Sequence, residues 1–388
     1  MTQPITVVSP GIESGYHSGE PFDMRNITRR ILTVLIVLSV VALSACAHRI
    51  EGTASTSMGI GYVWRYRTGG DIETSPVVVG NVVYVMKSDG EVHAVNVSGG
   101  SMLWRLSLGG GAGGEPVHSL DALFVGTAAG DVYAVDALSG NALWRTIPGI
   151  APLSAPTVWG GAVYIGDADG WLYALDGETG VEIWRTNVDG AVRAAPVVSY
   201  GVVFVGDASG TVRAIDAGTM KEYWRYAAPG GVVSSPAVAS VGKGRTVIVT
   251  DESGTVSRLD AETGEIEWTY QGPSGIEAAP VVVETEWGTA VLIASTGGAV
   301  ILLRLDRGKP IWETSLLTSF YTTPLVQDGI IYLIDESGGI FALDADTGEA
   351  LWRCHGDANP DTSPIAAGGL LFFSGRDGSL YAITIPDR

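Results

Sequence analysis

Residues 155–184 read A-P-T-V-W-G-G-A-V-Y-I-G-D-A-D-G-W-L-Y-A-L-D-G-E-T-G-V-E-I-W, and this stretch decides the fold of the chain. It contains four short runs of β-branched, aromatic and aliphatic residues, at positions 157–159, 162–165, 172–175 and 181–184. Gly-Gly, Asp-Gly and Glu-Thr-Gly turn signals separate the runs. The stretch therefore predicts four short strands joined by tight turns, which is an antiparallel meander.

The same unit recurs along almost the whole chain. A tryptophan ends each copy, with spacings of 40, 40, 40, 40, 44, 44 and 40 residues. These tryptophans are Trp64, Trp104, Trp144, Trp184, Trp224, Trp268, Trp312 and Trp352. An X-Pro dipeptide precedes the first strand of each unit, at Pro76, Pro116, Pro156, Pro196, Pro236, Pro280, Pro324 and Pro364. Units of about 40 residues with four strands apiece are typical of a β-propeller, because one blade cannot bury both faces and must stack on its neighbours.

The two ends of the repeat predict how the ring closes. Residues 62–64 read as a fourth strand with no three strands before it, and residues 363–384 supply three strands with no fourth after them. The amino-terminal strand is therefore expected in the last blade, which would remove both free sheet edges. We predict an all-β, eight-bladed propeller of four antiparallel strands per blade over residues 62–388, as one domain because stacked blades share a core.

The first 46 residues have the pattern of an export signal. Arg25, Arg29 and Arg30 precede an apolar run at residues 31–43, which is short for a spanning helix. The run ends in Leu-Ser-Ala-Cys, which resembles the bacterial lipobox and predicts lipidation of Cys46; an uncleaved anchor is the alternative. Residues 1–23 are polar, so Met24 is a possible true start. The Ser-, Thr- and Gly-rich residues 47–61 are predicted to be a flexible tether.

Composition narrows the possible partners and chemistry. The formal net charge is −19, which argues against nucleic acid or anionic lipid as a partner. The only cysteines are Cys46 and Cys354, so no internal disulfide is expected after lipidation. Asp167 begins an Asp-x-Asp-Gly turn that lacks the later ligands of a calcium loop. The histidines are scattered, and no metal site is predicted; they are His17, His48, His93, His118 and His355.

Within each unit, the third strand and the following turn read Ala-x-Asp-x-x-Thr-Gly-x-x-x-Trp, cleanly at Ala174, Asp176, Thr179, Gly180 and Trp184. Glycine suits a turn with positive φ, aspartate can bind the amides of the turn, and alanine leaves space for an indole. The motif resembles the tryptophan-docking repeat shared by pyrroloquinoline quinone (PQQ) dehydrogenases and BamB-type outer-membrane assembly lipoproteins, and the resemblance covers residues 62–388. The repeat departs from this pattern at Asn96, Met220, Arg258, Leu302 and Arg304.

The resemblance implies either of two functions, quinone-dependent catalysis or a role in outer-membrane assembly. The quinone enzymes use a vicinal cysteine pair, a calcium ion on Glu, Asn and Asp ligands, and a catalytic Asp. No vicinal cysteine pair exists in this chain. We therefore expect no enzymatic activity, no PQQ or other cofactor, and no catalytic residues.

Candidate interaction residues lie in two groups. The loops that lead into the first strands should line the mouth of the central channel, and the third residue before each proline offers charged or aromatic groups at Glu73, Arg193, Glu277, Tyr321 and Asp361. This mouth is either an interaction or small-ligand site, or a solvated rim. The first hairpins of the fifth and sixth blades are four residues longer and carry Trp287 near a tip, as a partner anchor or as packing.

The resemblance and the signal together lead to a functional expectation. We expect a lipid-anchored extracytoplasmic scaffold, with a monomeric propeller and a BamB-like role in outer-membrane β-barrel assembly. Its candidate partner is an envelope complex with a BamA-type insertase, and in a Gram-negative cell it would lie on the periplasmic face of the outer membrane. A ligand-binding or sensor propeller on the cell surface is the alternative, and a PQQ-dependent dehydrogenase is third.

Overall fold

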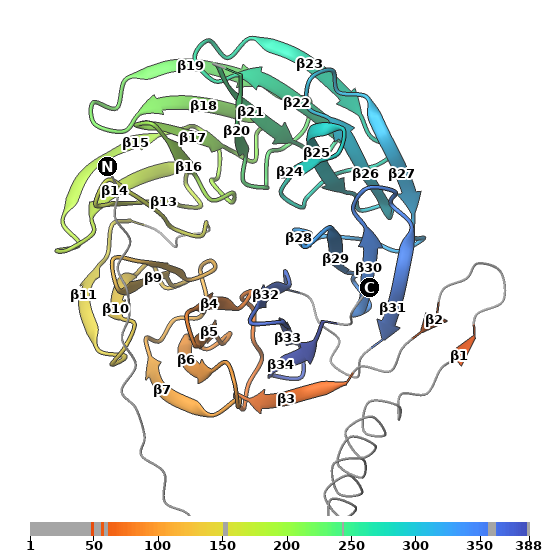
Figure 1. The fold of residues 1–388 in the computed structure, drawn as a ribbon. Helices are drawn as coiled ribbons and strands as arrows, with labels where there is room; N and C mark the ends of the chain where they lie inside the picture. The colour runs from red at the N-terminus through yellow and green to blue at the C-terminus, as the bar shows by residue number, and fades with distance from the viewer. Residues whose placement is uncertain are drawn as a thin grey trace, which may run out of the picture. The chain divides into compact units, whose positions relative to one another are not determined.

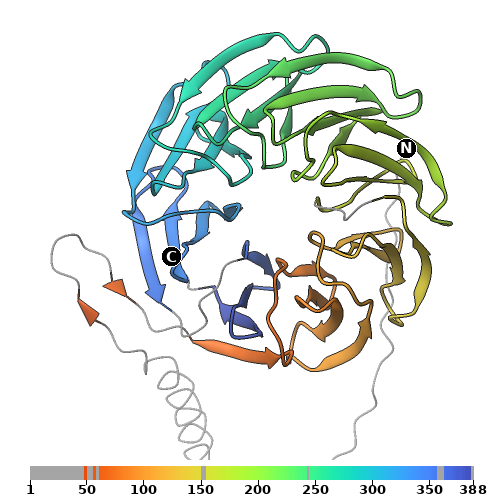
Figure 2. The same cartoon turned by 180° about the vertical axis from the view of Figure 1, so that it is seen from behind.

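The computed structural model describes residues 48–49, 56–57, 61–149, 154–242, 244–355 and 362–385. All regular elements within these residues are strands, numbered β1 to β34. No helix in this part of the chain is long and apolar enough to cross a membrane. Figures 1 and 2 show the strands grouped into blades around a centre, with the last strand of each blade at the periphery.

Each of the first seven blades is a four-stranded meander in chain order. Blades 1 to 4 are β4 (Val77–Val79), β5 (Val82–Met86), β6 (Glu91–Asn96), β7 (Met102–Ser107); β8 (Val117–Ser119), β9 (Ala122–Gly126), β10 (Val132–Asp136), β11 (Ala142–Thr146); β12 (Thr157–Trp159), β13 (Ala162–Gly166), β14 (Trp171–Asp176), β15 (Glu182–Asn187); β16 (Val197–Ser199), β17 (Val202–Gly206), β18 (Thr211–Asp216), β19 (Glu222–Ala227).

Blades 5 to 7 are β20 (Ala237–Val241), β21 (Gly244–Thr250), β22 (Thr255–Asp260), β23 (Ile266–Gln271); β24 (Val281–Thr285), β25 (Gly288–Ala294), β26 (Ala299–Arg304), β27 (Pro310–Ser315); β28 (Leu325–Gln327), β29 (Ile330–Ile334), β30 (Gly339–Asp344), β31 (Ala350–His355). The first strand has five residues in blades 5 and 6 and three in the other blades. The extra residues predicted for these two hairpins therefore lengthen the strands themselves.

Blade 8 joins the two ends of the repeat. It contains β32 (Ile365–Ala367), β33 (Leu370–Gly375), β34 (Ser379–Thr384) and, as its outer strand, β3 (Tyr62–Arg67) from the start of the repeat. β3 pairs antiparallel with β34, and Trp64 lies opposite Ala382. The predicted eight-bladed fold and its closure by the amino-terminal strand are confirmed.

The repeated tryptophans join each blade to the next. In seven of the eight cases the described residues include a hydrogen bond from the indole Nε1 to a main-chain carbonyl of the following blade, at 2.7 to 3.1 Å. Trp184 of blade 3, for example, donates to Ala217 of blade 4 at 2.8 Å. Within its own blade, Trp184 lies opposite Ala174, the small residue of the motif. The indole thus occupies the space between two blades, and its polar atom is satisfied there.

The turn that receives the indole explains the Asp and Gly of the motif. In blade 3, Asp176 Oδ1 accepts hydrogen bonds from the amides of Glu178 and Thr179 at 3.2 and 2.8 Å. Gly180 has a φ of 71°, and a Cβ added there would lie 2.6 Å from Cε3 of Trp144. Glycine therefore meets two requirements at once: a left-handed backbone and a flat surface under the indole of the preceding blade.

Each departure from the motif is accommodated locally. Asn96 replaces the aspartate and accepts the Ser98 amide at 3.0 Å. Met220 takes the glycine position at a φ of 63°. Arg258, at an alanine position, is 8% exposed and forms an ion pair with Glu267 at 2.6 Å. Arg304 replaces an aspartate and pairs with Asp306 in the same turn; Leu302 is buried.

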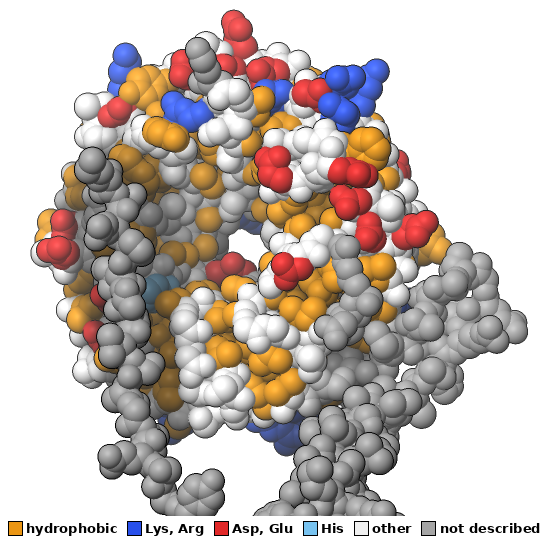
Figure 3. Space-filling model, viewed as in Figure 1, with side chains coloured by type: hydrophobic (Ala, Val, Ile, Leu, Met, Phe, Trp, Pro, Cys, Tyr) orange, Lys and Arg blue, Asp and Glu red, His pale blue; other side chains and the backbone are white. Residues whose placement is uncertain are grey.

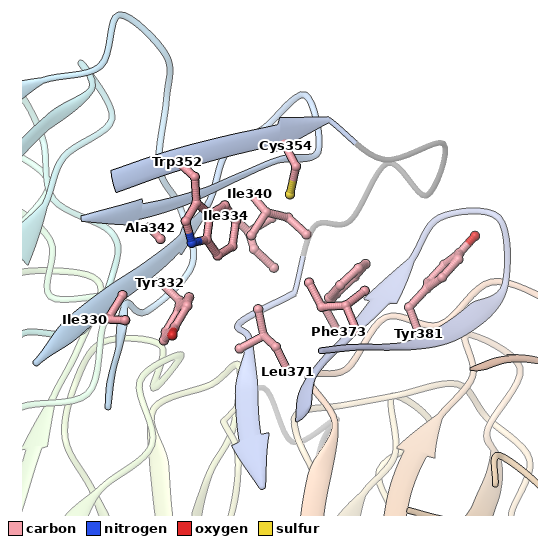
Figure 4. Close-up of a cluster of buried hydrophobic side chains, with 11 residues drawn as sticks. Ile330, Tyr332, Ile334, Ile340, Ala342, Trp352, Cys354, Leu371, Phe373 and Tyr381 are labelled. Atoms are coloured by element: carbon pink, nitrogen blue, oxygen red, sulfur yellow. The ribbon is translucent and has the colours of Figure 1, made fainter. Parts of the chain in front are cut away.

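The hydrophobic core lies between neighbouring blades. One cluster joins Tyr332 and Trp352 of blade 7 to Leu371 and Phe373 of blade 8, and Figure 4 shows these side chains meeting across the gap between the two sheets. Cys354 belongs to this cluster and is 4% exposed. Burial raises the pKa of its thiol to about 12, so Cys354 is a core residue with little thiolate at neutral pH.

The predicted signal and Cys46 lie outside the described residues and stay predictions. In the predicted tether, the structure places two-residue strands β1 (His48–Arg49) and β2 (Thr56–Ser57), which pair with each other. β2 also pairs in parallel with β31 of blade 7, with Ser57 opposite Arg353. The remainder of residues 47–60 lies outside the description.

Candidate functional site

The mouth loops, meaning the loops that lead into the first strand of each blade, present alternate residues to the blade and to the centre. In the loop into blade 4, Val192 and Ala194 are 0% and 2% exposed, whereas Arg193 between them is exposed. Glu277 has the same position between two buried residues in the loop into blade 6. Successive side chains of extended backbone point to opposite sides, so in these two loops the third residue before the proline faces away from its blade.

Buried contacts hold the mouth loops against the blades. Val192 packs against Gly166 of blade 3, where an added Cβ would lie 2.2 Å from Val192 Cγ1. The side-chain oxygen of Ser154, two residues before the proline of blade 3, accepts the Gly166 amide at 2.9 Å. Thr74 and Thr362 occupy the matching position in blades 1 and 8 and each accept an amide from their own second strand. The mouth residues therefore project from a backbone that the blades hold in place.

The mouth residues meet in one central cavity of about 330 Å³. Glu73, Arg193, Glu277 and Tyr321, four of the five predicted mouth residues, line it. Asp361, the fifth, lies outside the described residues. The space-filling view shows acidic side chains beside the opening at the centre of the ring (Figure 3). Whether these four side chains bind anything stays a prediction, but the structure does bring them together.

Glu115 also lines the cavity and was not predicted. It directly precedes Pro116, whereas the third residue before that proline is Gly113. The loop into blade 2 is rich in glycine, and Gly109, Gly110 and Gly111 all have positive φ. The simple alternation of extended backbone therefore does not apply to this loop, and the spacing from the proline could not locate the residue.

The cavity is acidic, and its charged side chains are not engaged by other described residues. Glu73, Glu115 and Glu277 face one cation, Arg193, among the charged side chains of its described lining. These four side chains have no hydrogen bond or ion pair with other described residues. Hydroxyls from several blades complete the wall, at Ser75, Ser234, Ser235, Thr322, Thr323, Thr362 and Ser363. Such a cavity can bind a polar or cationic group through several blades at once.

Two further cations of the propeller, Lys87 and Arg213, form ion pairs within the fold. Lys87 Nζ pairs with Asp89 at 2.8 Å and Glu91 at 3.1 Å, and these partners raise its pKa above the usual value. Arg213 is 6% exposed and pairs with Glu222 at 3.2 Å and with Asp189, which lies in the same mouth loop as Arg193. A charge change at Asp189 would leave Arg213 underpaired, so Arg193 is the residue of this loop to test.

Trp287 lies where it was predicted along the chain, in the turn between β24 and β25. Its side chain is 51% exposed, and its amide donates to Thr285 Oγ1 at 3.1 Å. First hairpins and mouth loops connect opposite ends of the same strands, so Trp287 is on the other face from the cavity. We call the two sides the hairpin face and the mouth face.

Eight blades around a polar mouth, with seven described indole-to-carbonyl hydrogen bonds between neighbouring blades, define a PQQ-like repeat propeller. The family model described as outer membrane protein assembly factor BamB matches residues 61–146, 88–194, 128–274 and 277–387. The chain therefore belongs to this family. No curated protein sequence matches it significantly.

Solved structures show the same fold at low sequence identity. BamB from Moraxella catarrhalis is 19% identical over 85% of this chain and 98% of that chain, with a TM-score of 0.69. A quinohemoprotein alcohol dehydrogenase from Pseudomonas putida HK5 is 16% identical over 84% of this chain and 76% of that chain, with a TM-score of 0.71. The computationally designed protein Ika8 is 18% identical over 84% and 99%, with a TM-score of 0.72. BamB, an alcohol dehydrogenase and a designed protein share this architecture, so the fold alone does not assign a function.

The described lining of the cavity lacks the vicinal cysteine pair of the quinone enzymes. Its charged side chains are Glu73, Glu115, Glu277 and Arg193. Cys354, the cysteine of the propeller, lies in the core between blades 7 and 8 and not in this lining. No step of quinone chemistry follows from these residues.

Proposed function

We propose that this protein is a lipid-anchored, extracytoplasmic scaffold without enzymatic activity or a resident cofactor. Its mouth face would bind an envelope protein complex that assembles outer-membrane β-barrels, with a BamA-type insertase as the candidate partner. The match to the BamB family model over nearly all of the propeller carries this proposal. The charges of the central cavity support it, because they have no ion pair with other described residues and project from mouth loops that buried contacts hold in place.

A ligand-sensing propeller is the second candidate. The 330 Å³ cavity and its hydroxyl-lined wall favour it, since a polar small molecule would find donors and acceptors from several blades. The two functions differ in what occupies the mouth face: a protein surface in the first, a small solute in the second.

Arg193→Glu tests the scaffold. Arg193 is exposed and has no ion pair with other described residues, so its reversal should leave stability unchanged and weaken a contact made at the mouth. We expect capture of the barrel insertase by crosslinking in the native envelope to fall by about ten-fold, which corresponds to about 1.4 kcal/mol.

Lys309→Glu is the matched control, because it makes the same charge change at an exposed position on the hairpin face. Equal loss of capture in both variants would mean a non-specific charge effect. Normal capture by Arg193→Glu would remove the mouth face from the proposal, and recovery of no envelope complex by the wild type would remove the scaffold function itself.

Cys46→Ser tests the anchor. A lipobox cysteine supplies the thiol that is acylated, so the variant should lose all labelling by a radioactive fatty acid and accumulate as an unprocessed precursor. Labelling and membrane fractionation of wild type and variant measure this. If wild-type protein is released in soluble form without label, the lipid anchor is wrong; an uncleaved wild-type chain that stays in the membrane would instead support the anchor alternative.

A further inference from the structure

The hairpin face of blades 1 to 3 carries an apolar patch that the proposed scaffold function does not use. Leu120, Leu138 and Trp159 are 61%, 89% and 41% exposed, and they lie in or beside the hairpin-face turns of blades 2 and 3. Beside them, a cavity of about 480 Å³ opens between blades 1 and 2, with Leu103 and Leu138 in its wall. We call Leu103, Leu120, Leu138 and Trp159 the leucine patch.

The members of the patch extend from one blade to the next. A Cβ added to Gly177 of blade 3 would lie 3.6 Å from Leu120 Cδ1, and a Cβ added to Gly201 of blade 4 would lie 3.6 Å from Trp159 Cη2. Each side chain therefore leans over a turn of the following blade. Arg245 covers the ring of Tyr200 at 4.7 Å, and this cation marks the far limit of the patch.

The backbone at Leu120 is unfavourable for leucine. Leu120 and Asp121 have φ values of 53° and 60°, whereas the matching turn of blade 3 is Gly160-Gly161. A left-handed backbone is strained for a bulky residue, and exposure gives the side chain little burial in return. The chain thus holds a leucine in a position where glycine would suit the fold better, which indicates a use for the exposed side chain.

The charged residues in the hairpin-face turns of blades 1 to 3 have one sign. The hairpin-face turns of blades 1 to 3 are residues 80–81, 96–101, 120–121, 136–141, 160–161 and 176–181, and they contain no Lys or Arg. Their acidic residues are Asp121, Asp136, Asp176 and Glu178. Asp121 and Asp136 also line the cavity beside Leu138. Hydrogen bonds from Ser139 lower the pKa of the Asp136 carboxyl, which keeps it ionised.

From the exposed leucines, the strained turn and the surrounding carboxylates, we propose that the leucine patch is a docking site for a basic segment of a partner protein that also carries large apolar side chains. An apolar side chain of the partner fills the cavity between blades 1 and 2. Its Lys or Arg residues meet Asp121 and Asp136. The site lies on the opposite face from the central cavity, so it is independent of the proposed mouth-face function and allows two partners to bind at once.

The test uses the purified full-length protein and short fluorescent peptides. The probe contains Lys, Leu and Gly, and a matched peptide has Glu in place of every Lys. Fluorescence anisotropy should show binding of the Lys peptide that weakens with added salt. The affinity for the Glu peptide should be lower by a factor of at least about ten. The variant Leu120→Gly/Leu138→Ser should bind the Lys peptide about ten-fold more weakly than wild type.

Leu317→Gly is the matched control, since Leu317 is 92% exposed and has a φ of 55° but lies in a mouth loop. It should bind the Lys peptide like wild type. Because glycine relieves the left-handed strain, both Leu→Gly changes should leave the melting temperature equal or higher, which separates a binding defect from misfolding.

Four results would each overturn the proposal. The first is undiminished binding of the Lys peptide by the patch variant, and the second is equal binding of the Lys and Glu peptides. The third is Leu120-dependent binding to phosphatidylcholine vesicles with no binding of the Lys peptide, which would make the patch a lipid contact. The fourth is a wild-type dimer in sedimentation that the patch variant converts to monomer, which would make the occupant a second copy of the chain.

Discussion

Trp64→Ala is expected to destabilise the propeller by about 3 kcal/mol, the lower end of the usual cost of truncating a core aromatic side chain, because Trp64 is half-buried. The ring centroids of Trp64 and Phe372, in the same blade, lie 5.7 Å apart. The indole Nε1 of Trp64 donates a hydrogen bond to the carbonyl oxygen of Val97 in blade 1 at 2.7 Å. Truncation opens a cavity where the first and last parts of the repeat meet and leaves the Val97 carbonyl without this partner. Urea denaturation and the melting temperature measure the loss.

Deletion of β3, Tyr62–Arg67, should have a larger effect than Trp64→Ala. It removes the whole ladder to β34 and the ion pair of Arg65 with Asp377, and it exposes the edge of blade 8. An exposed strand edge is a template for pairing with other chains, so the deletion variant should aggregate in size-exclusion chromatography.

Trp287→Ala is the control for both changes. Trp287 is 51% exposed at a hairpin tip, so its truncation should change stability by no more than about 0.5 kcal/mol. If Trp64→Ala melts like Trp287→Ala, closure of the ring does not stabilise the propeller in solution, and the role given to β3 is wrong.

Gly180→Ala is expected to cost about 2–4 kcal/mol. Two effects contribute: about 1 kcal/mol for a side chain in left-handed backbone, and about 1–3 kcal/mol for overpacking against the half-buried indole of Trp144. The added Cβ would lie 2.6 Å from Cε3 of Trp144 and 2.7 Å from Oγ1 of Thr146, which donates to the Gly180 carbonyl at 2.6 Å. Neither group can withdraw without loosening the junction of blades 2 and 3.

Gly160→Ala in the same blade separates the two effects. Gly160 has a φ of 60°, but an added Cβ there meets nothing within 4 Å. This control should therefore lose only about 1 kcal/mol, from the backbone alone. Equal denaturation midpoints for the two variants would show that the indole contact adds nothing. Met220, at the matching turn of blade 4 with a φ of 63°, shows that the ring tolerates one such side chain, so Gly180→Ala should fold.

Blade number, strand order and closure were predictable from sequence for a local reason. β-branched runs, turn glycines and the tryptophan period each describe one blade, and the same description recurs at every copy. The single strand at residues 62–64 has no other strands of its own repeat, and the last repeat has only three strands. The single strand therefore completes the last blade, where it pairs with β34. The mouth positions Glu73, Arg193, Glu277 and Tyr321 followed from their spacing to the prolines, because extended backbone alternates.

The tertiary structure determined which charges and which exposed side chains lie beside one another. Glu115 reaches the cavity through a glycine loop whose positive φ values no spacing rule contains. Asp189, in a mouth loop, is paired with Arg213 of β18, and Leu120 leans over the turn of the next blade. The repeat in the sequence determines the strands and turns of each blade, because these depend on near neighbours along the chain. The stacking of blades determines which side chains share a surface, because those neighbours lie tens of residues apart along the chain and meet only when the blades pack together.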